Sequence, residues 1–267
     1  MSRLLITRGP VTTVTLNRPD VRNALDEALI AEVTAWAEQV SADRSVRVVV
    51  LAGAGPVFCA GADLGWMQRA AAFTREENIA DAKTAAEMFL ALDSLPVPLI
   101  GRVQGAAIGG GVGLLAICDL VIAADDTRFG LSETHLGLVP AMISPYLIRK
   151  IGLSAARLHA LSGSAFGAQQ AAAMGLVDHV VPASQLDVAV DRAIAAFSRA
   201  APSAIAATKR LFAAVAGHEP ADVVGITAEA IADARMSPEG QEGIRAFFGK
   251  RAPSWATQPP GSPTRRS

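Results

Sequence analysis

The chain has 267 residues, of which 51% are hydrophobic and 18% charged, and its formal net charge is -1. A chain of this length can bury a sizeable core, and its composition excludes disorder for most of its length. The balanced charge, with no run of Lys/Arg longer than two residues, argues against a nucleic-acid partner.

The cysteines and the apolar stretches bear on the cellular compartment. Cys59 and Cys118 are too few for a disulfide framework or a zinc cluster, and they suit a reducing environment. The first eight residues are too poor in apolar side chains for a signal peptide. The uncharged, glycine-rich stretch 103–118 is shorter than the roughly 20 apolar residues that span a bilayer. We therefore expect a cytoplasmic protein with no membrane partner.

The N-terminal part of the chain predicts strands followed by a helix. Two short strands at 4–7 and 11–16 are joined by Gly9-Pro10, which indicates a hairpin. Apolar residues then recur at helical spacing over about 26–40. The continuous apolar run at 46–51 is typical of a strand buried on both faces.

The rest of the chain continues this alternation and then becomes helical. After a small-residue loop at 58–64, we expect a long helix, three strands and a glycine-rich turn, and then a series of helices. The expected ranges are helix 75–95, strands 99–103, 120–123 and 129–132, glycine-rich turn 105–113, and helices 143–151, 155–161, 168–174, 186–200, 203–216, 221–234 and 238–250.

This order predicts an α/β fold with three parts. Strands and helices alternate in a core domain over 1–200, and helices alone make up a C-terminal region at 201–251. The prolines, glycine and serines of 252–267 predict a mobile tail.

Several catalytic signatures are absent, which excludes their chemistry. The sequence has no G-x-S-x-G, H-E-x-x-H, C-x-x-C or P-loop pattern. Its histidines lack ligand spacing, so we expect no metal; they are His135, His159, His179 and His218. The string from Gly111 to Ala116 fits G-x-G-x-x-A, but residues 104–108 separate it from its strand and no second nucleotide-binding unit follows. This weakens a dinucleotide-binding interpretation.

Two small-residue loops carry the strongest functional pattern. The loops are 59–64 and 104–111, and each follows a strand and opens a helix. Small residues let a ligand approach the backbone, and free N–H groups at a helix start favour negative charge. Two such loops can direct one N–H each at a single oxygen, as in an oxyanion hole. Either loop alone is also explained by tight strand–helix packing; the lone acid Glu133, in a similar small-residue setting, favours a site.

These motifs, taken together, resemble those of the enoyl-CoA hydratase/isomerase (crotonase) superfamily. The resemblance runs in order over about residues 5–253. The matching strings are Asn17-Arg18-Pro19, Ala60-Gly61-Ala62-Asp63-Leu64, Gln104-Gly105 with Gly109-Gly110-Gly111, Cys118-Asp119, Phe129-Gly130 with Glu133, and Leu136-Gly137-Leu138-Val139-Pro140.

The resemblance implies a fold, a reaction and a set of roles. It implies a crotonase-like spiral of ββα turns, a C-terminal helical trimerisation region, and a homotrimer or dimer of trimers. It implies an acyl-CoA substrate and no cofactor beyond the coenzyme A of that substrate. By position, the backbone N–H groups of Ala62 and Gly110 hold the thioester oxygen, and Glu133 is the catalytic acid–base.

The resemblance also implies residues that contact the substrate. Arg22, and Lys250 from a neighbouring subunit, are candidates for the CoA phosphates, although simple solvation explains an isolated surface cation equally well. Trp66 and Met67 are candidates for the acyl pocket or for plain core. Asp63 is as well placed to pin its loop as to touch substrate. The other implied contacts are Ala24, Ala60, Leu64, Gly109, Gly113, Pro140 and Phe247.

Shorter strings indicate a subfamily, and one position departs from the family pattern. Gly65-Trp66-Met67-Gln68, Ile143-Ser144-Pro145-Tyr146 and the segment 239–247 resemble bacterial methylglutaconyl-CoA hydratases. Many hydratases of the family carry two catalytic glutamates, but Gly113 stands where the first is expected. We expect the missing side chain to open space for water or a bulky acyl group. Hydration of a 2-enoyl-CoA is the predicted reaction; double-bond isomerisation and non-catalytic acyl-CoA binding are the alternatives.

Overall fold

The computed structural model describes residues 2–256. The chain divides into two compact units, which part between Asp191 and Arg192 inside helix α7 (Leu186–Phe197). The sequence had placed this division near residue 200. Among the described residues, no helix combines the length and the apolar character needed to cross a membrane.

The larger unit is built on a six-stranded sheet with the order β1-β2-β3-β4-β6-β9. β1 pairs antiparallel with β2, and every other neighbouring pair is parallel. The strands are β1 (Leu4–Thr7), β2 (Val11–Leu16), β3 (Val48–Gly53), β4 (Leu99–Val103), β6 (Leu120–Ala124) and β9 (His179–Val181). Every residue of the central strand β3 is buried, which explains its unbroken apolar sequence.

A second, three-stranded sheet has the order β5-β7-β8. It consists of β5 (Ala106–Ile108), β7 (Arg128–Gly130) and β8 (Phe166–Gly167). β5 lies inside the segment that the sequence had predicted as a glycine-rich turn. β7 ends at Gly130, two residues before the predicted end at 132, and the 3-10 helix η2 (Glu133–Leu136) follows. The small sheet therefore connects the glycine-rich turn to the chain that carries Glu133.

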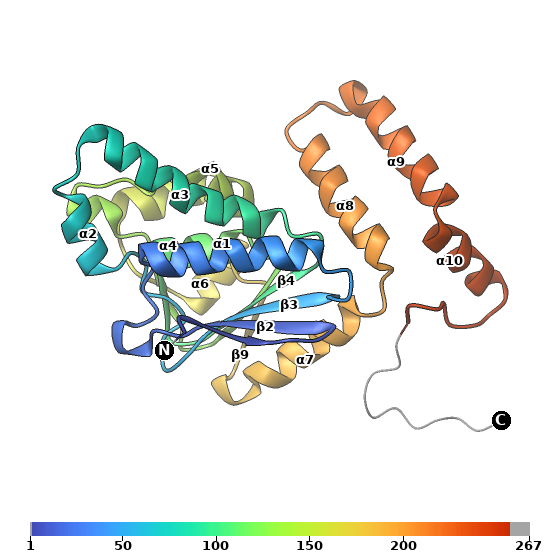
Figure 1. The fold of residues 1–267 in the computed structure, drawn as a ribbon, viewed down its shortest axis with the longest axis horizontal. Coiled ribbons are helices and arrows are strands. Elements are labelled where there is room, and N and C mark those ends of the chain that lie inside the picture. The colour runs from blue at the N-terminus through green and yellow to red at the C-terminus, as the bar shows by residue number, and fades with distance from the viewer. Residues whose placement is uncertain (1, 257–267) are drawn as a thin grey trace. The chain divides into compact units, whose positions relative to one another are not determined.

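Two long helices lie over one face of the large sheet and pack against each other (Figure 1). They are α1 (Glu27–Ala42) and α3 (Arg75–Asp93). Asp26 caps α1 by accepting a hydrogen bond from the N–H of Leu29. At the start of α3, Thr74 and Glu77 form a capping box.

The remaining helices of this unit are short or interrupted. The bounds are α2 (Leu64–Ala70), α4 (Gly110–Ala116), α5 (Ser144–Ser162), α6 (Ala168–Ala173), η1 (Pro19–Val21) and η3 (Ala183–Gln185). α5 is broken at Gly152, whose φ of 74° is not helical. This break agrees with the two separate helices expected over 143–151 and 155–161.

The second unit is helical, as the sequence predicted for this region. It contains η4 (Pro220–Val223) and the helices α8 (Pro202–Val215), α9 (Val224–Met236) and α10 (Pro238–Phe248). The three α-helices contact one another. Large apolar side chains stay exposed on them, among them Phe212 (66%), Met236 (81%) and Phe247 (79%).

Candidate active site

The first glycine-containing loop turns one backbone N–H away from the protein. Leu25 forms a parallel bridge with Ala62 by donating to the carbonyl of Gly61 (2.7 Å) and accepting from the N–H of Asp63 (2.8 Å). In such a bridge the polar groups of the middle residue point to the opposite side. Ala62 is exposed, and among the hydrogen bonds within residues 2–256 its N–H donates to none. This N–H is thus open to a ligand.

The second loop supplies a matching donor at the start of α4. Gly109 donates to the carbonyl of Gly130 (2.8 Å), and its φ of 50° sets the turn into the helix. Gly110 is the first residue of α4, so its N–H lacks a helical partner. In the described part of the chain, no hydrogen bond starts from that N–H.

The two loops converge, because a bridge between Cys59 and Ala107 joins them. Cys59 donates to the carbonyl of Ala106 (3.2 Å) and accepts from the N–H of Ile108 (3.0 Å). A Cβ atom built on Gly61 would lie 3.6 Å from the nitrogen of Gly110 and 2.8 Å from the carbonyl oxygen of Ile108. Only glycine allows this approach, and it brings the two free N–H groups to one place.

Glu133 brings a carboxylate to the second loop, next to Gly109. Its Oε1 atom would lie 3.0 Å from a Cβ atom built on Gly109, so the carboxylate rests against the second loop. Its Oε2 atom is buried and has no hydrogen-bond partner within residues 2–256. Burial raises the pKa of Glu133, and a hydrogen bond from its own backbone N–H acts in the opposite direction without cancelling the rise. An unpartnered carboxylate with a raised pKa suits proton transfer near neutral pH.

Gly113 does not open the space that the sequence predicted. A Cβ atom built there would lie 2.1 Å from Cγ2 of Ile143 and 3.1 Å from Cε1 of Phe89. The position that carries a glutamate in many family members is therefore filled by the Ile143 side chain. The prediction of room for water or for a bulky acyl group next to Gly113 is wrong.

Asp63 holds its loop through the backbone and through an arginine. Its Oδ1 accepts from the N–H groups of Gly65 (2.8 Å) and Trp66 (3.1 Å), which caps α2. Its Oδ2 accepts from Arg18 (2.9 Å). Of the two roles left open by the sequence, these contacts support the pinning of the loop.

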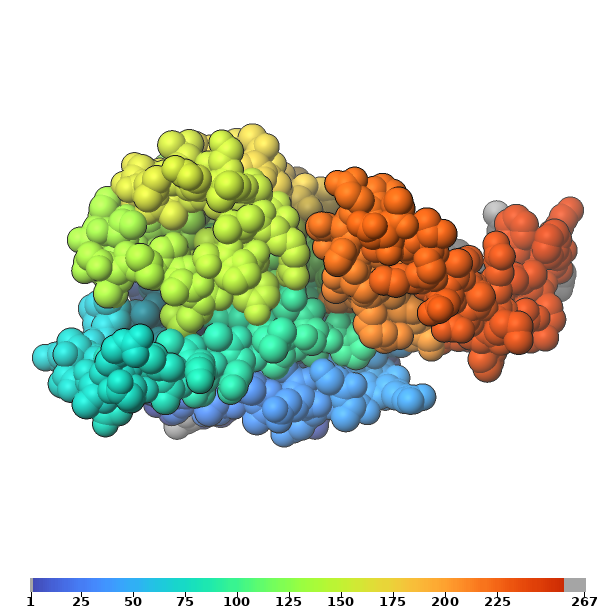
Figure 2. Space-filling view, turned by 90° about the horizontal axis from the view of Figure 1, so that it is seen from above, coloured from blue at the N-terminus to red at the C-terminus, as the bar shows by residue number. Residues whose placement is uncertain are grey.

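The side chains of the neighbouring helix α2 differ in how far they are exposed to solvent. Trp66 is buried, and its indole N–H donates to the carboxylate of Asp81 (3.1 Å), as expected of a core residue. Met67 is partly exposed. Leu64, the first residue of α2, is 81% exposed. One face of this unit shows a recess between the teal helices α2 and α3 and the yellow-green chain around α5 (Figure 2).

The other predicted contacts fall into two groups. Arg22 is exposed, and its carbonyl accepts from the N–H of Ala60 (2.9 Å), whereas Ala24 is buried and its carbonyl accepts from Arg18. Pro140 is partly exposed in the loop after η2. Phe247 and Lys250 are exposed in the second unit, where Lys250 has a φ of 50°. Their contribution to an acyl-CoA site stays a prediction.

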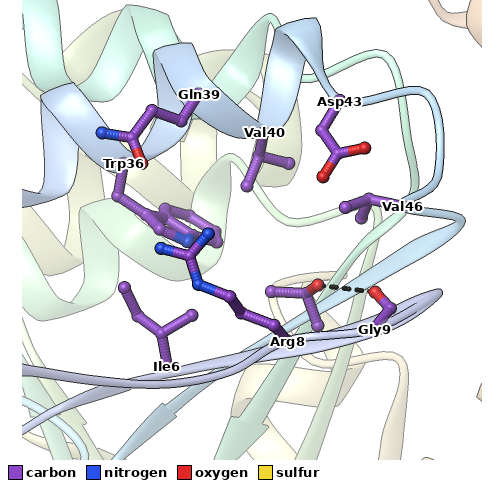
Figure 3. Close-up of a pocket in the computed structure, with 9 residues that line it drawn as sticks. Ile6, Arg8, Gly9, Trp36, Gln39, Val40, Asp43 and Val46 are labelled. Carbon is purple, nitrogen blue, oxygen red and sulfur yellow. Dashed lines mark hydrogen bonds between the residues drawn. The ribbon is translucent and has the colours of Figure 1, made fainter.

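Alternative chemistries find little support in the described residues. The Cys59 thiol is buried, which raises its pKa to about 12 and makes it a poor nucleophile. Within residues 2–256, no group of three or more His, Cys, Asp or Glu side chains is arranged to hold a metal. A pocket of about 60 Å³ opens between the β1–β2 hairpin and α1, where it is lined by Arg8, Trp36 and Asp43 (Figure 3). None of the predicted site residues lines it.

Three residues of this site, Leu25, Ile143 and Arg18, had no individual role in the prediction from sequence. Leu25 directly precedes the helix expected over 26–40, and its backbone forms the bridge to Ala62. Ile143 was noted only within a subfamily string, yet it fills the space beside Gly113. Arg18 was part of a motif without a role. The side-chain size of Ile143 next to a glycine carries no signal in the sequence, because the two residues meet only in the fold.

The sequence is similar to those of known proteins over nearly its whole length. Residues 7–258 match the family described as enoyl-CoA hydratase/isomerase. The chain is 36% identical to the 2,3-dehydroadipyl-CoA hydratase of Escherichia coli, covering 96% of this chain and 99% of that protein. It is 34% identical to a putative enoyl-CoA hydratase of Thermus thermophilus, covering 93% and 98%.

Solved structures agree with this relationship. An enoyl-CoA hydratase from Shewanella pealeana superimposes with a TM-score of 0.92 at 39% identity, covering 95% of this chain and 96% of that one. The predicted crotonase-like α/β fold is therefore confirmed. From its sequence, its fold and the convergence of its two glycine-containing loops, the chain is an enzyme of the enoyl-CoA hydratase/isomerase family.

Proposed function

We propose that this enzyme adds water across the double bond of a 2-enoyl-CoA thioester, with Glu133 as its acid–base residue. The observation that carries the proposal is the position of the Glu133 carboxylate. It lies against Gly109, one residue from the free N–H of Gly110, and its Oε2 atom lacks a partner within residues 2–256. Relatives named as hydratases support the same reaction class.

The proposed reaction uses three groups of this chain. The N–H groups of Ala62 and Gly110 donate to the thioester oxygen, which polarises the conjugated double bond. Glu133 accepts a proton from water while the water oxygen bonds to C3 and the π electrons move to the thioester oxygen as an enolate. Glu133 then returns the proton to C2. The product is a 3-hydroxyacyl-CoA, the glutamate is regenerated, and no cofactor beyond coenzyme A takes part.

We favour a branched substrate of the methylglutaconyl-CoA type. Three strings support this choice. Trp66 and Met67 of the first string lie on α2 directly after the first loop, and Ile143 of the second string contacts Gly113. Arg22 and Lys250 remain the candidates for the CoA phosphates. Homotrimers, or dimers of trimers, remain the proposed assembly, and the cytoplasm the proposed compartment.

A second reaction is supported by one specific observation. Position 113 is a glycine, so it lacks the carboxylate that many hydratases have there. The Ile143 side chain occupies the space beside it. A single glutamate suffices for an isomerase, in which Glu133 moves a proton between C4 and C2 and no water adds.

A product panel separates these functions. Purified enzyme is incubated in H₂¹⁸O with methylglutaconyl-CoA, crotonyl-CoA or a 3-enoyl-CoA, and the products are identified by mass spectrometry. Hydration predicts a 3-hydroxyacyl-CoA that carries ¹⁸O, with methylglutaconyl-CoA the best substrate. A shifted double bond without ¹⁸O supports the isomerase instead. Binding of all three thioesters without any product indicates an acyl-CoA-binding protein and contradicts the proposed catalysis.

A further inference from the structure

One arginine contacts two segments of the chain, residues 24–26 and Asp63 of the first loop. Nη1 of Arg18 donates to the carbonyl of Ala24, and Nη2 lies 2.9 Å from Oδ2 of Asp63 and 3.0 Å from Oδ2 of Asp26. Ala24 directly precedes Leu25, and Asp63 directly follows Ala62. The guanidinium therefore holds both sides of the Leu25–Ala62 bridge, the contact that turns the Ala62 N–H outward.

Arg18 is itself held rigidly. Its backbone N–H donates to Oδ1 of Asn23 (2.9 Å), and its carbonyl accepts from the backbone N–H of Asn23 (2.8 Å). The Asn23 side chain is buried and donates to the carbonyls of Ala54 (2.8 Å) and Val57 (2.7 Å), in the segment after β3. The guanidinium thus projects from a fixed point of the fold.

The Arg18 guanidinium lies between the carboxylates of Asp26 and Asp63 and holds them close together. Asp26 caps α1 and Asp63 caps α2, and the side chains of both are shielded from solvent, with exposed fractions of 9% and 13%. Burial alone raises the pKa of Asp63, but hydrogen bonds from Trp66, Arg18 and Gly65 outweigh it and hold that pKa below its usual value. Both aspartates contact the same Nη2 atom of Arg18, and two carboxylates held this close repel each other when no cation lies between them.

We infer that Arg18 is a positioning residue for the oxyanion hole, and that it acts through Asp63 and Ala24 to aim the Ala62 N–H at the thioester oxygen. The inference rests on the proposed function, because it assumes that this N–H binds that oxygen. Arg18 does not touch the reacting atoms. Removal of the guanidinium lets the repelling carboxylates separate, which tilts the loop that carries Ala62.

The test compares Arg18→Met with a matched control, Arg69→Met. Arg69 also links the start of α1 to α2, through a bidentate contact with Glu27, but this pair is exposed and contacts neither side of the bridge. Two properties are measured for each variant: kcat and KM with an enoyl-CoA, and the infrared frequency of a ¹³C-labelled thioester carbonyl in bound butyryl-CoA. The carbonyl frequency reports the hydrogen bonds made to the oxygen, independently of turnover.

The wild-type enzyme should lower the carbonyl frequency on binding. Arg18→Met should lose at least half of this shift and reduce kcat by about 10- to 100-fold, as misplacement of a catalytic group by about 1 Å does, with KM changed by less than about threefold. Arg69→Met should keep the full shift and kcat within about twofold. A full carbonyl shift and normal kcat in folded Arg18→Met would overturn the inference.

Arg18→Lys covers the case in which Arg18→Met does not fold. Lysine keeps the charge between the two aspartates but lacks the planar fork that reaches Ala24 as well. It should fold, with a reduced carbonyl shift and kcat lowered about tenfold. Wild-type values in Arg18→Lys, with Arg18→Met unfolded, would assign Arg18 to stability alone. If wild-type enzyme shifts the carbonyl without turnover and Arg18→Met loses the shift, the positioning role stands and the proposed reaction fails.

Discussion

Glu133 combines partial burial with a position beside two free backbone donors. Its raised pKa follows from burial, because removal from water disfavours the charged form. Its Oε2 atom has no partner within residues 2–256, so its environment leaves it free to exchange a proton with a bound ligand. The same environment predicts how activity and stability respond to pH.

Activity should fall in acid at a higher pH than for an ordinary glutamate. Glu133 must be ionised to take a proton from water, so kcat/KM decreases as pH falls through its raised pKa. A pH–rate profile with a non-ionising acyl group checks this. An acid limb at or below the ordinary glutamate value near 4.3 would contradict the burial argument.

The corresponding effect on stability has the opposite direction. A carboxyl whose folded-state pKa is raised stabilises the fold below its unfolded pKa, and this contribution is lost as pH rises through the folded pKa. Ionised Glu133 is therefore a stability cost at neutral pH, typical of a group selected for function.

Gly113 shows that a missing side chain does not imply a vacant space. Gly113→Ala should lower the free energy of unfolding by ~1–3 kcal/mol, because its Cβ would overlap Ile143. Ile143→Gly should relieve the overlap, so the double variant loses less stability than the sum of the single variants. Denaturant unfolding of the four proteins measures this coupling. Strict additivity would mean that the two residues do not compete for the same volume.

Residue types and the family resemblance together led to the predicted site. Small residues indicated the two loops and an isolated carboxyl indicated Glu133, because both leave a signal in sequence. The resemblance assigned the donor to Gly110, and these roles stay predictions. The contacts of Arg18 and Ile143 left none, since each depends on segments far apart in the chain that meet only after folding.

At the scale of elements, the start of α4 is the feature that the proposed chemistry needs most. Gly110 is the first helical residue, a position that tolerates proline because its N–H has no helical partner. Among the described residues, the only side-chain atom within 4 Å of a Cβ built there is Cδ1 of Leu25, the end of a flexible side chain, at 3.1 Å.

Gly110→Pro should therefore remove a catalytic donor while the protein still folds. Loss of one oxyanion donor typically lowers kcat by about 10²–10³-fold. Gly110→Ala is the matched control, since it adds a Cβ atom but keeps the N–H, and it should stay within about fivefold of wild type. Equal kcat values for the two folded variants would remove the Gly110 N–H from the mechanism.

The long elements were predictable, whereas of the short strands β5, β7, β8 and β9 only β7 was predicted. Buried strands such as β3 and the capped helix α3 follow from apolar runs and cap residues. β5, β8 and β9 contain only two or three residues each, and so short a segment shows no alternation of apolar and polar residues that would predict a strand. These short strands matter, because β5 and β7 bring the second loop to Glu133.

At the scale of the whole molecule, the exposed apolar side chains of α8, α9 and α10 predict self-association. Phe212, Met236, Phe247 and Phe248 are each at least 66% exposed, which is costly for an isolated chain in water. We expect trimers, or dimers of trimers, in which these side chains are covered. Light scattering at micromolar concentration measures the mass. A stable monomer would contradict the assembly and leave Lys250 without a neighbouring site.

The central claim is that Glu133 performs the proton transfers beside two backbone donors. The most direct test is kcat for Glu133→Gln with the best enoyl-CoA of the product panel. We expect kcat to fall by about 10²–10⁴-fold, the usual contribution of a general acid–base group, while butyryl-CoA still binds and the protein stays folded. A folded Glu133→Gln with kcat within a few-fold of wild type would contradict it.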